Sequence, residues 1–220
     1  MKKVYSVLFC ALLVMAVVFA GSVFAEDFKN TSGKEMDIRI ISKSFNNQFY
    51  QAAFKGAADA AAKLGVKITT NGPDMETNTS QQVEQVKAAV NAKPDAIILA
   101  ACDTASLEET LDAAKEAGIP VIGFDSGVPG DTTGAVLATA ATDNAKAGAN
   151  VAENLIADPN FQKAILKGTE KNPTVLAVLA QDATSGSIVQ RVDGFIAKAV
   201  AALEALEGLS GAVSVSGQEK

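Results

Sequence analysis

The amino-acid sequence predicts an α/β protein with a doubly wound parallel sheet. Short apolar runs alternate along the chain with stretches of helical period, the spacing typical of βα units. Residues 96–101 form a continuous apolar run, as in a strand that is buried on both faces. Gly or Pro follows most of the helical stretches, where helices usually end. Parallel strands with right-handed crossovers follow from this order.

The first strand, loop and helix occupy residues 36–67. An apolar strand is expected at residues 38–41, and a helix runs from Phe49 to its end at Gly65. The loop between them is dense in hydrogen-bonding groups and aromatic rings. An open α/β sheet binds its ligand at the carboxyl ends of the strands, so this loop is the first candidate for a ligand site.

The remaining elements divide the chain into two units. We expect an N-terminal α/β lobe at residues 36–140 and a partial C-terminal α/β lobe at residues 141–220. Further strands are expected at residues 66–69, 96–101, 120–124, 135–140 and 174–180, and another begins at Val213. Helices are expected before Pro94, at residues 106–117, from Asn144 to Ile156 and at residues 188–206, and residues 158–173 look rich in loops. The second lobe then has about two strands against five in the first, so we expect the chain to be truncated at its C-terminus.

The N-terminus has the features of a cleavable signal peptide. Two lysines precede the apolar stretch 4–20, and small residues lead up to an expected cleavage after Ala25. The alternative is a transmembrane anchor, because the apolar run approaches spanning length. Residues 26–35 are polar and are expected to form a disordered lead. The protein is therefore expected in the periplasm or another extracytoplasmic location.

Composition excludes several classes of function. The chain carries a net charge of −6 without a basic patch, which argues against nucleic acid and anionic membranes as partners. It has no histidine, so the commonest general base and metal ligand is missing. Removal of residues 1–25 would leave Cys102 as the single cysteine, without an intramolecular disulfide, and we expect a passive buried thiol. We expect a monomeric binding protein, not an enzyme, with no cofactor and no metal.

Three polar loops follow predicted strands, at residues 43–50, 125–130 and 181–187. Two belong to the first lobe and one to the second, so a cleft between the lobes would gather all three around a small ligand. Asp125 can accept hydrogen bonds from two neighbouring hydroxyls, and Asn47 offers a donor and an acceptor. Phe49 and Tyr50 could stack on the C–H face of a sugar ring.

Four segments carry a resemblance to a known family: 44–50 (SFNNQFY), 118–126 (GIPVIGFDS), 141–144 (ATDN) with Gly148, and 191–195 (RVDGF). Each is weak alone, but together they occur in one order with sensible spacing. The chain resembles, from about Met36 to Lys220, the periplasmic sugar-binding proteins of ABC transporters, of the ribose-binding type with the class I periplasmic fold. The resemblance implies a monosaccharide-like sugar or polyol as ligand and a membrane permease as partner.

The resemblance also implies which side chains bind the ligand. Asn47 matches a family asparagine that hydrogen bonds sugar hydroxyls, Phe49 and Tyr50 match its stacking aromatics, and Asp125 matches its ligand-binding aspartate. The full set of expected ligand-binding residues is Lys43, Ser44, Asn47, Phe49, Tyr50, Asp125, Ser126, Gln181 and Arg191, and Thr142, Asp143 and Asn144 are expected at a hinge or cap.

Three departures from the ribose-binding pattern make another sugar possible. Ser126 stands where an arginine is usual in that subgroup. The position of a second ligand-binding arginine of the subgroup falls near Val189, so of that motif this chain keeps only the outer arginine, as Arg191. Lys43 stands where that subgroup has a serine. The chain thus lacks two arginine donors and gains a lysine.

Each candidate also has a purely structural interpretation. Asp125 could form a turn, and Asn47 could cap a helix. Core packing competes for Phe49 and Tyr50, although adjacent helical residues point apart, so both rings are not expected to be buried. Arg191 could pair with Asp193 or a neighbouring carboxylate instead of a ligand.

Other functions fit the same fold. An exported carbohydrate-active enzyme would need Asp125 to work with another carboxylate, and no nucleophile motif such as Gly-x-Ser-x-Gly is present. A periplasmic sugar sensor for chemotaxis or signalling would differ from a transport protein only in its partner. A transcription regulator would need a basic helix-turn-helix before the core, where this chain has an apolar segment.

Overall fold

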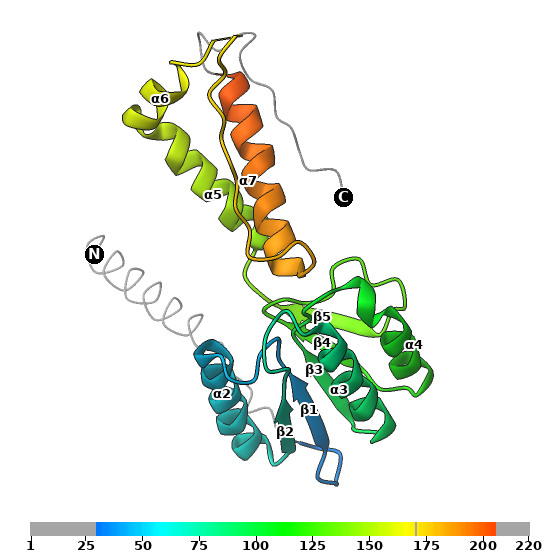
Figure 1. Cartoon of the computed structure of the whole chain (residues 1–220). Helices are drawn as coiled ribbons and strands as arrows, with labels where there is room; N and C mark the ends of the chain where they lie inside the picture. The colour runs from blue at the N-terminus through cyan, green and yellow to red at the C-terminus, as the bar shows by residue number, and fades with distance from the viewer. Residues whose placement is uncertain (1–29, 170, 206–220) are drawn as a thin grey trace, which may run out of the picture.

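The computed structural model describes residues 30–169 and 171–205, and these contain a five-stranded parallel sheet (Figure 1). Its strands are β1 (Asp37–Ile41), β2 (Lys67–Asn71), β3 (Ala96–Leu99), β4 (Val121–Phe124) and β5 (Val136–Ala140). The predicted α/β fold with a parallel sheet is confirmed. The expected signal peptide, the first part of the expected lead and the strand expected at Val213 lie outside the described residues.

The spatial order of the strands is β2-β1-β3-β4-β5. Ile41, the last residue of β1, is in register with Asn71 of β2 and with Leu99 of β3. The chain therefore moves to one side after β1 and crosses to the other side after β2. The loops that follow β1 and β3 diverge at this switch point, where open α/β sheets bind their ligands.

Helices cover both faces of the sheet. Helices α3 (Thr79–Asn91) and α4 (Glu108–Glu116) pack on one face, after a short 3-10 turn, η1 (Ala105–Leu107), that leads into α4. Helix α2 (Gln48–Leu64) packs on the other, where Tyr50 and Phe54 join a core cluster with Ile40 of β1. Local signals set the limits of α2, because Asn47 caps its start and Gly65 ends it in the left-handed conformation, with φ of 67°.

A helical second part follows the sheet. Helices α5 (Asn144–Ala157) and α7 (Gly186–Glu204) lie side by side beyond the carboxyl edge of the sheet. They approach closely where two glycines meet backbone: a Cβ on Gly148 would lie 2.0 Å from the carbonyl oxygen of Arg191, and one on Gly194 would lie 2.1 Å from that of Ala145. Only glycine permits this backbone-to-backbone contact.

A short helix, α6 (Pro159–Ile165), lies where the sequence predicted loops. Asp158 caps it by accepting hydrogen bonds from the backbone N–H groups of Asn160 and Phe161, at 2.8 and 2.9 Å. Residues 158–173 were expected to be rich in loops, but proline is favoured at the first position of a helix, where no N–H is needed. That expectation was therefore wrong at this position.

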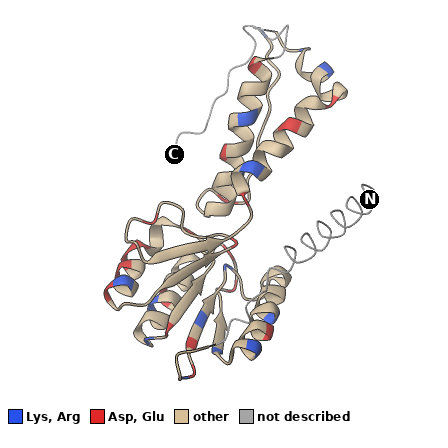
Figure 2. Cartoon of the chain, turned by 180° about the vertical axis from the view of Figure 1, so that it is seen from behind, with Lys and Arg blue, Asp and Glu red and all other residues tan. Residues whose placement is uncertain are grey.

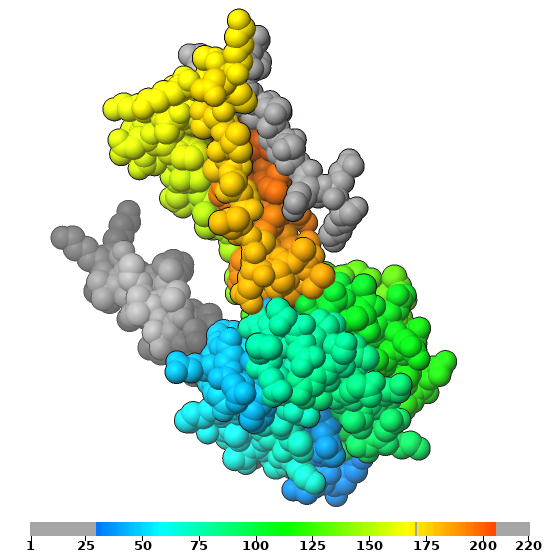
Figure 3. Space-filling model, in the orientation of Figure 1, coloured from blue at the N-terminus to red at the C-terminus, as the bar shows by residue number. Residues whose placement is uncertain are grey.

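The strand expected at residues 174–180 is not formed. This segment has no regular hydrogen bonding and runs over the surface beside α5 and α7 (Figure 3). Its apolar side chains are open to solvent, with Val175 81% and Leu179 95% exposed. A strand needs a hydrogen-bonded neighbour, and no strand of residues 30–169 and 171–205 lies beside it. The apolar pattern alone therefore did not produce a strand.

Charged residues of both signs are interspersed along the helices in the view of Figure 2. In the part of the chain that the structure describes, no helix combines the length and apolar character needed to cross a membrane.

Candidate ligand-binding site

The three predicted polar loops meet at the carboxyl edge of the sheet. The Tyr50 hydroxyl donates to Asp125 Oδ2 at 2.7 Å, which joins the first loop to the second. Lys43 Nζ donates to Ser185 Oγ at 3.4 Å, which joins the first to the third. Residues far apart in the sequence thus come together. The first two loops follow strands, as predicted, whereas the third reaches this edge without the strand that was expected before it.

The second and third loops are joined through a buried serine. Ser126 Oγ accepts a hydrogen bond from the backbone N–H of Ser187 at 3.2 Å, while its carbonyl accepts one from Ala101. Ser126 is fully buried and makes both contacts within the protein. Ser126 therefore holds the loops together at the position where the ribose-binding pattern has an arginine.

Lys43 is buried directly after β1, with only 3% of its surface exposed. Its ammonium lies 2.9 Å from Glu76 Oε2, which supplies the opposite charge that a buried cation requires. Ser44 is also buried, and its hydroxyl donates to the carbonyl of Asp74 at 3.3 Å. Ser44 therefore anchors the first loop on the β2–α3 connection.

Glu76 is the centre of the polar contacts and was not among the sequence candidates. Asn47 Nδ2 donates to its Oε1 atom at 3.2 Å, and Gln181 Nε2 donates to its Oε2 atom at 2.9 Å. With Lys43, three predicted ligand residues thus converge on one carboxylate, and we call these four side chains the Glu76 cluster. The one signal in the sequence was that Glu76 follows a predicted strand; no motif marked it.

Asn47 combines the two interpretations that the sequence left open. Its Oδ1 atom accepts a hydrogen bond from the backbone N–H of Phe49 at 2.9 Å, so it caps α2. Its amide nitrogen still points to Glu76. A single side chain therefore stabilises the helix start and contributes a donor to the cluster.

A second feature at this edge is an open cavity of about 450 Å³ beside Asp125. We call it the Asp125 cavity, and its lining residues are Phe49, Phe124, Asp125, Ala140, Ala141 and Thr142. Phe49 is 57% exposed and presents its ring there. Asp125 has φ of 54°, a left-handed conformation that aspartate tolerates better than most residues.

The structure separates the roles of the two adjacent aromatic residues. Tyr50 is 2% exposed and packs edge-to-face against Phe124 and Phe49, with ring centroids 6.1 and 5.1 Å apart. Its ring is enclosed in the core, so it has no free face for the stacking that was expected of it, whereas Phe49 does. Tyr50 contacts the site through its hydroxyl, which holds Asp125.

Two buried groups have pKa values raised above their ordinary range. Burial raises the pKa of Tyr50 most, followed by the hydrogen bond to Asp125 and the negative charges of Asp125 and Glu76. The hydroxyl therefore stays protonated and remains a donor. Burial also raises the pKa of Cys102 to about 12, although the charge of Lys43 opposes this. This thiol lies at the switch point, against the carbonyl of Lys43, in a neutral form.

The expected hinge residues lie at the junction of β5 and α5. Asp143 caps α5 by accepting from the backbone N–H of Lys146 at 3.0 Å. Asn144 is buried, and its amide donates to Gln190 Oε1 of α7 at 3.5 Å. Thr142 is exposed and lines the Asp125 cavity. These residues thus form a cap and a link to α7.

Arg191 lies outside both groups of side chains. It occupies the second turn of α7, and its backbone carbonyl packs on Gly148. None of the ion pairs among the described residues includes Arg191, so the alternative pairing with Asp193 is not observed either. Its proposed contact with a ligand stays a prediction.

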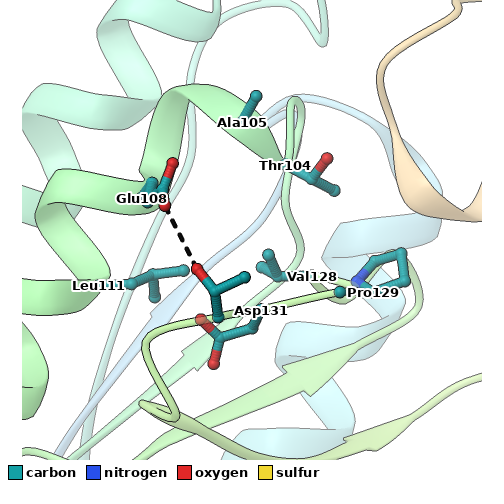
Figure 4. A pocket seen from close by; sticks show the side chains of 9 residues that line it. Thr104, Ala105, Glu108, Leu111, Val128, Pro129 and Asp131 are labelled. Atoms are coloured by element: carbon teal, nitrogen blue, oxygen red, sulfur yellow. Dashed lines mark hydrogen bonds between the residues drawn. The ribbon is translucent and has the colours of Figure 1, made fainter.

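A smaller cavity, of about 230 Å³, lies between η1 with α4 and the β4–β5 loop (Figure 4). Thr132 Oγ1 donates to Glu108 Oε1 at 3.2 Å across it, and Leu111 and Val128 form an apolar wall. None of its nine lining residues was among the expected ligand-binding residues. Among the described residues, no group of three or more His, Cys, Asp or Glu side chains is placed to hold a metal ion.

Comparison with known proteins gives one family and several relatives. Residues 38–219 match the family described as "Periplasmic binding protein domain". The ribose import binding protein of Bacillus subtilis (strain 168) is 27% identical over 160 residues, which is 72% of this chain and 50% of that protein. An ABC transporter periplasmic-binding protein of Escherichia coli (strain K12) is 30% identical over 115 residues, 52% of this chain and 34% of that protein.

Solved structures give the same picture. A protein named as an ABC transporter, LacI family transcriptional regulator, from Brachyspira murdochii is 35% identical, with a TM-score of 0.68 over 81% of this chain and 55% of its own. An ABC transporter solute-binding protein from Agrobacterium vitis, solved with bound D-fucose, is 36% identical, with a TM-score of 0.64 over 75% of this chain and 53% of its own. The chain thus spans at most about half the length of these curated relatives.

Proposed function

The chain belongs to the periplasmic binding protein domain family, and from this membership we propose that it captures a monosaccharide-like ligand and delivers it to an ABC transporter permease. The observation that carries the proposal is the convergence of all three polar loops on one edge of the sheet. Relatives support a sugar as the ligand, because one is named for ribose import and solved structures hold D-fucose and D-arabinose.

Capture would use the chemistry on both sides of this edge. Phe49 offers an exposed ring for the C–H face of a sugar, and Asp125 offers a carboxylate that is already oriented by Tyr50. Lys43, Asn47 and Gln181 supply donors in the neighbouring Glu76 cluster. Such a mixture of one aromatic face and several donors and acceptors suits an uncharged ring with many hydroxyls.

In this proposal, ligand capture includes a movement of the second lobe, which contains α5 and α7, relative to the sheet. We place the boundary between the two lobes at residue 141, after the last strand of the sheet. Thr142, Asp143 and Asn144 would then form the hinge, because α5 begins there. The loop that contains Gln181 and Ser185 already contacts Glu76 and Lys43, so opening at the hinge would admit the ligand and closure would return this loop over it.

Location and partner complete the proposal. We propose that residues 1–25 act as a signal peptide and that the mature protein works outside the cytoplasm, where the permease would receive the closed form. The family consists of binding proteins and not of enzymes, in line with the expectation of no catalytic activity. A sensory role with the same ligand site would differ only in the partner.

Calorimetry with D-ribose, D-arabinose and D-fucose tests the proposal. We expect the 220-residue chain to bind at least one of them with one site per chain, and to lose binding in Asp125→Asn. Asparagine keeps the shape and tolerates the left-handed backbone, so it removes the charge without straining the turn. Asp112→Asn, at an exposed position of α4, is the matched control and should bind normally.

Two results would contradict the proposal. The first is no heat and no thermal shift with these sugars or with a wider set of pentoses, hexoses and polyols. The second is consumption of the sugar during the titration, measured by NMR of the recovered ligand, which would instead indicate an enzyme.

A further inference from the structure

We propose that Glu76 is the specificity-determining acceptor of the ligand site, whose carboxylate is occupied by donors from both parts of the protein until an uncharged polyhydroxy ligand takes over part of these bonds. This inference rests on the proposed function and names a residue that neither the sequence motifs nor the comparisons assign.

The geometry of the Glu76 cluster is that of a preformed acceptor site. Lys43 Nζ and Gln181 Nε2 both lie 2.9 Å from Oε2, and Asn47 Nδ2 lies 3.2 Å from Oε1. Lys43 and Asn47 come from the loop after β1, whereas Gln181 comes from the segment before α7. One carboxylate therefore binds donors from two distant parts of the chain, and Gln181 lies 105 residues from Glu76 in the sequence.

The three bonds differ in how easily they exchange. The Lys43 side chain is 4% exposed and the Glu76 side chain 20%, so their ion pair is shielded, and breaking it would leave a buried charge. Asn47 and Gln181 are exposed, so water competes for their amides and their bonds cost little to replace. Ligand hydroxyls could therefore replace these two amides while Lys43 keeps Glu76 in place.

The position of Glu76 places it in the same small region as Asp125. Asn47 joins the two, because its amide donates to Glu76 Oε1 at 3.2 Å and its Oδ1 atom accepts from the backbone N–H of Phe49 at 2.9 Å. Phe49 in turn lines the Asp125 cavity. Lys43, the partner of Glu76, follows β1 at the switch point of the sheet. A ligand of monosaccharide size that extends from the Asp125 cavity past Phe49 toward Asn47 would thus meet the Asp125 and Glu76 carboxylates as acceptors.

The charges in this region disfavour an anionic ligand. Glu76, Asp125 and Asp182 contribute three carboxylates, and Lys43 is the one ammonium in the Glu76 cluster. Carboxylates accept hydrogen bonds from hydroxyls but repel phosphates and sugar acids. The ligand class that fits is a neutral compound with adjacent free hydroxyls.

The test uses calorimetry on the full chain with D-ribose, D-arabinose and D-fucose, and with D-ribose 5-phosphate as the anionic probe. Wild type should bind a neutral sugar and not the phosphate. Glu76→Gln should weaken binding of that sugar by about 10- to 100-fold, the effect of losing hydrogen bonds to a charged acceptor. Glu84→Gln makes the same change on the exposed side of α3 and should stay within about 2-fold of wild type.

A second variant keeps the test independent of folding. Glu76→Asp retains the charge that Lys43 needs but withdraws the carboxylate oxygens by one methylene. The variant should therefore fold and still bind the sugar about 10-fold more weakly than wild type. Circular dichroism and the melting temperature report whether each variant is folded. A loss of discrimination between sugar and phosphate in Glu76→Gln would separate a role in specificity from a purely structural one.

The outcomes are distinct. If wild type binds a sugar and both folded Glu76 variants bind it equally well, the inference is overturned and the proposed function stands. If wild type binds no sugar while remaining folded, the proposed function falls and takes this inference with it. If D-ribose 5-phosphate binds wild type more tightly than any neutral sugar, the assigned ligand class is wrong.

Discussion

Replacing Tyr50 by phenylalanine tests the link between the core and the ligand site. The substitution removes one hydroxyl and leaves the ring in its buried position between Phe124 and Phe49. It deletes the 2.7 Å hydrogen bond to Asp125 Oδ2, which is the contact that orients this carboxylate. Both stability and ligand binding should therefore change.

The expected loss of stability follows from the type of bond. Hydrogen bonds to charged groups contribute about 1.5–3 kcal/mol. Asp125 is only partly buried, so water can replace part of the lost contact, and we expect a loss of about 1–2 kcal/mol. For a protein of this size the melting temperature should fall by roughly 2–8 °C. Sugar binding should weaken by about 10-fold, because Asp125 loses its orientation.

The assay combines melting curves with a titration of phenolate absorbance. The sequence has two tyrosines, Tyr5 and Tyr50, and no tryptophan, so a Tyr5→Phe background reports on Tyr50 alone. The raised pKa of Tyr50 means that its stabilising effect is complete below about pH 10, the ordinary pKa of tyrosine, and is lost as the pH rises further. Phenolate should therefore appear only together with the loss of helical circular dichroism.

Two results would refute this reasoning. One is ionisation of Tyr50 near its ordinary pKa in a protein that keeps its helices, which would show an exposed hydroxyl. The other is a Tyr50→Phe variant with unchanged melting temperature and unchanged sugar affinity, which would show that Asp125 does not depend on this bond.

Three further predictions concern the packing and the thiol. Gly148→Ala should destabilise the α5–α7 pair by about 1–3 kcal/mol, because the new Cβ would lie 2.0 Å from the Arg191 carbonyl oxygen. Gly56→Ala, in open space on α2, should instead stabilise the protein by up to about 1 kcal/mol. Thermal unfolding measures both changes, and equal effects would contradict the close helix contact. Asp158→Ala should cost about 0.5–2 kcal/mol by removing the cap of α6, and helix content by circular dichroism should fall slightly. Cys102, with a pKa of about 12, should react with a thiol reagent at pH 8 only after unfolding, so rapid labelling of the native protein would show that it is accessible.

Local signals in the sequence predicted most of the first lobe. The apolar runs at residues 96–101 and 120–124 correspond to β3 and β4, because a strand buried on both faces needs apolar side chains throughout. Asn47 and Gly65 mark the ends of α2, because capping and left-handed conformations depend on single residue types. The parallel order of strands then followed from the βα alternation.

The same local reasoning failed in the second part, where context decides. The segment 174–180 has the apolar pattern of a strand but no neighbouring strand in the described chain, so the pattern alone was insufficient. The stretch that became α6 was interpreted as a loop, because a proline starts a helix or breaks one according to its position within it.

The sequence by itself therefore determined the elements of the sheet, the class of fold and the edge at which polar side chains would gather, because these follow from periodicity and from the behaviour of parallel strands. Only the tertiary structure decided which side chains meet. It enclosed Tyr50 and exposed Phe49, since adjacent side chains of a helix point in different directions, and it placed Glu76 between Lys43 and Gln181. The physical reason is that contacts between residues so far apart depend on how loops pack in three dimensions, which no local pattern encodes.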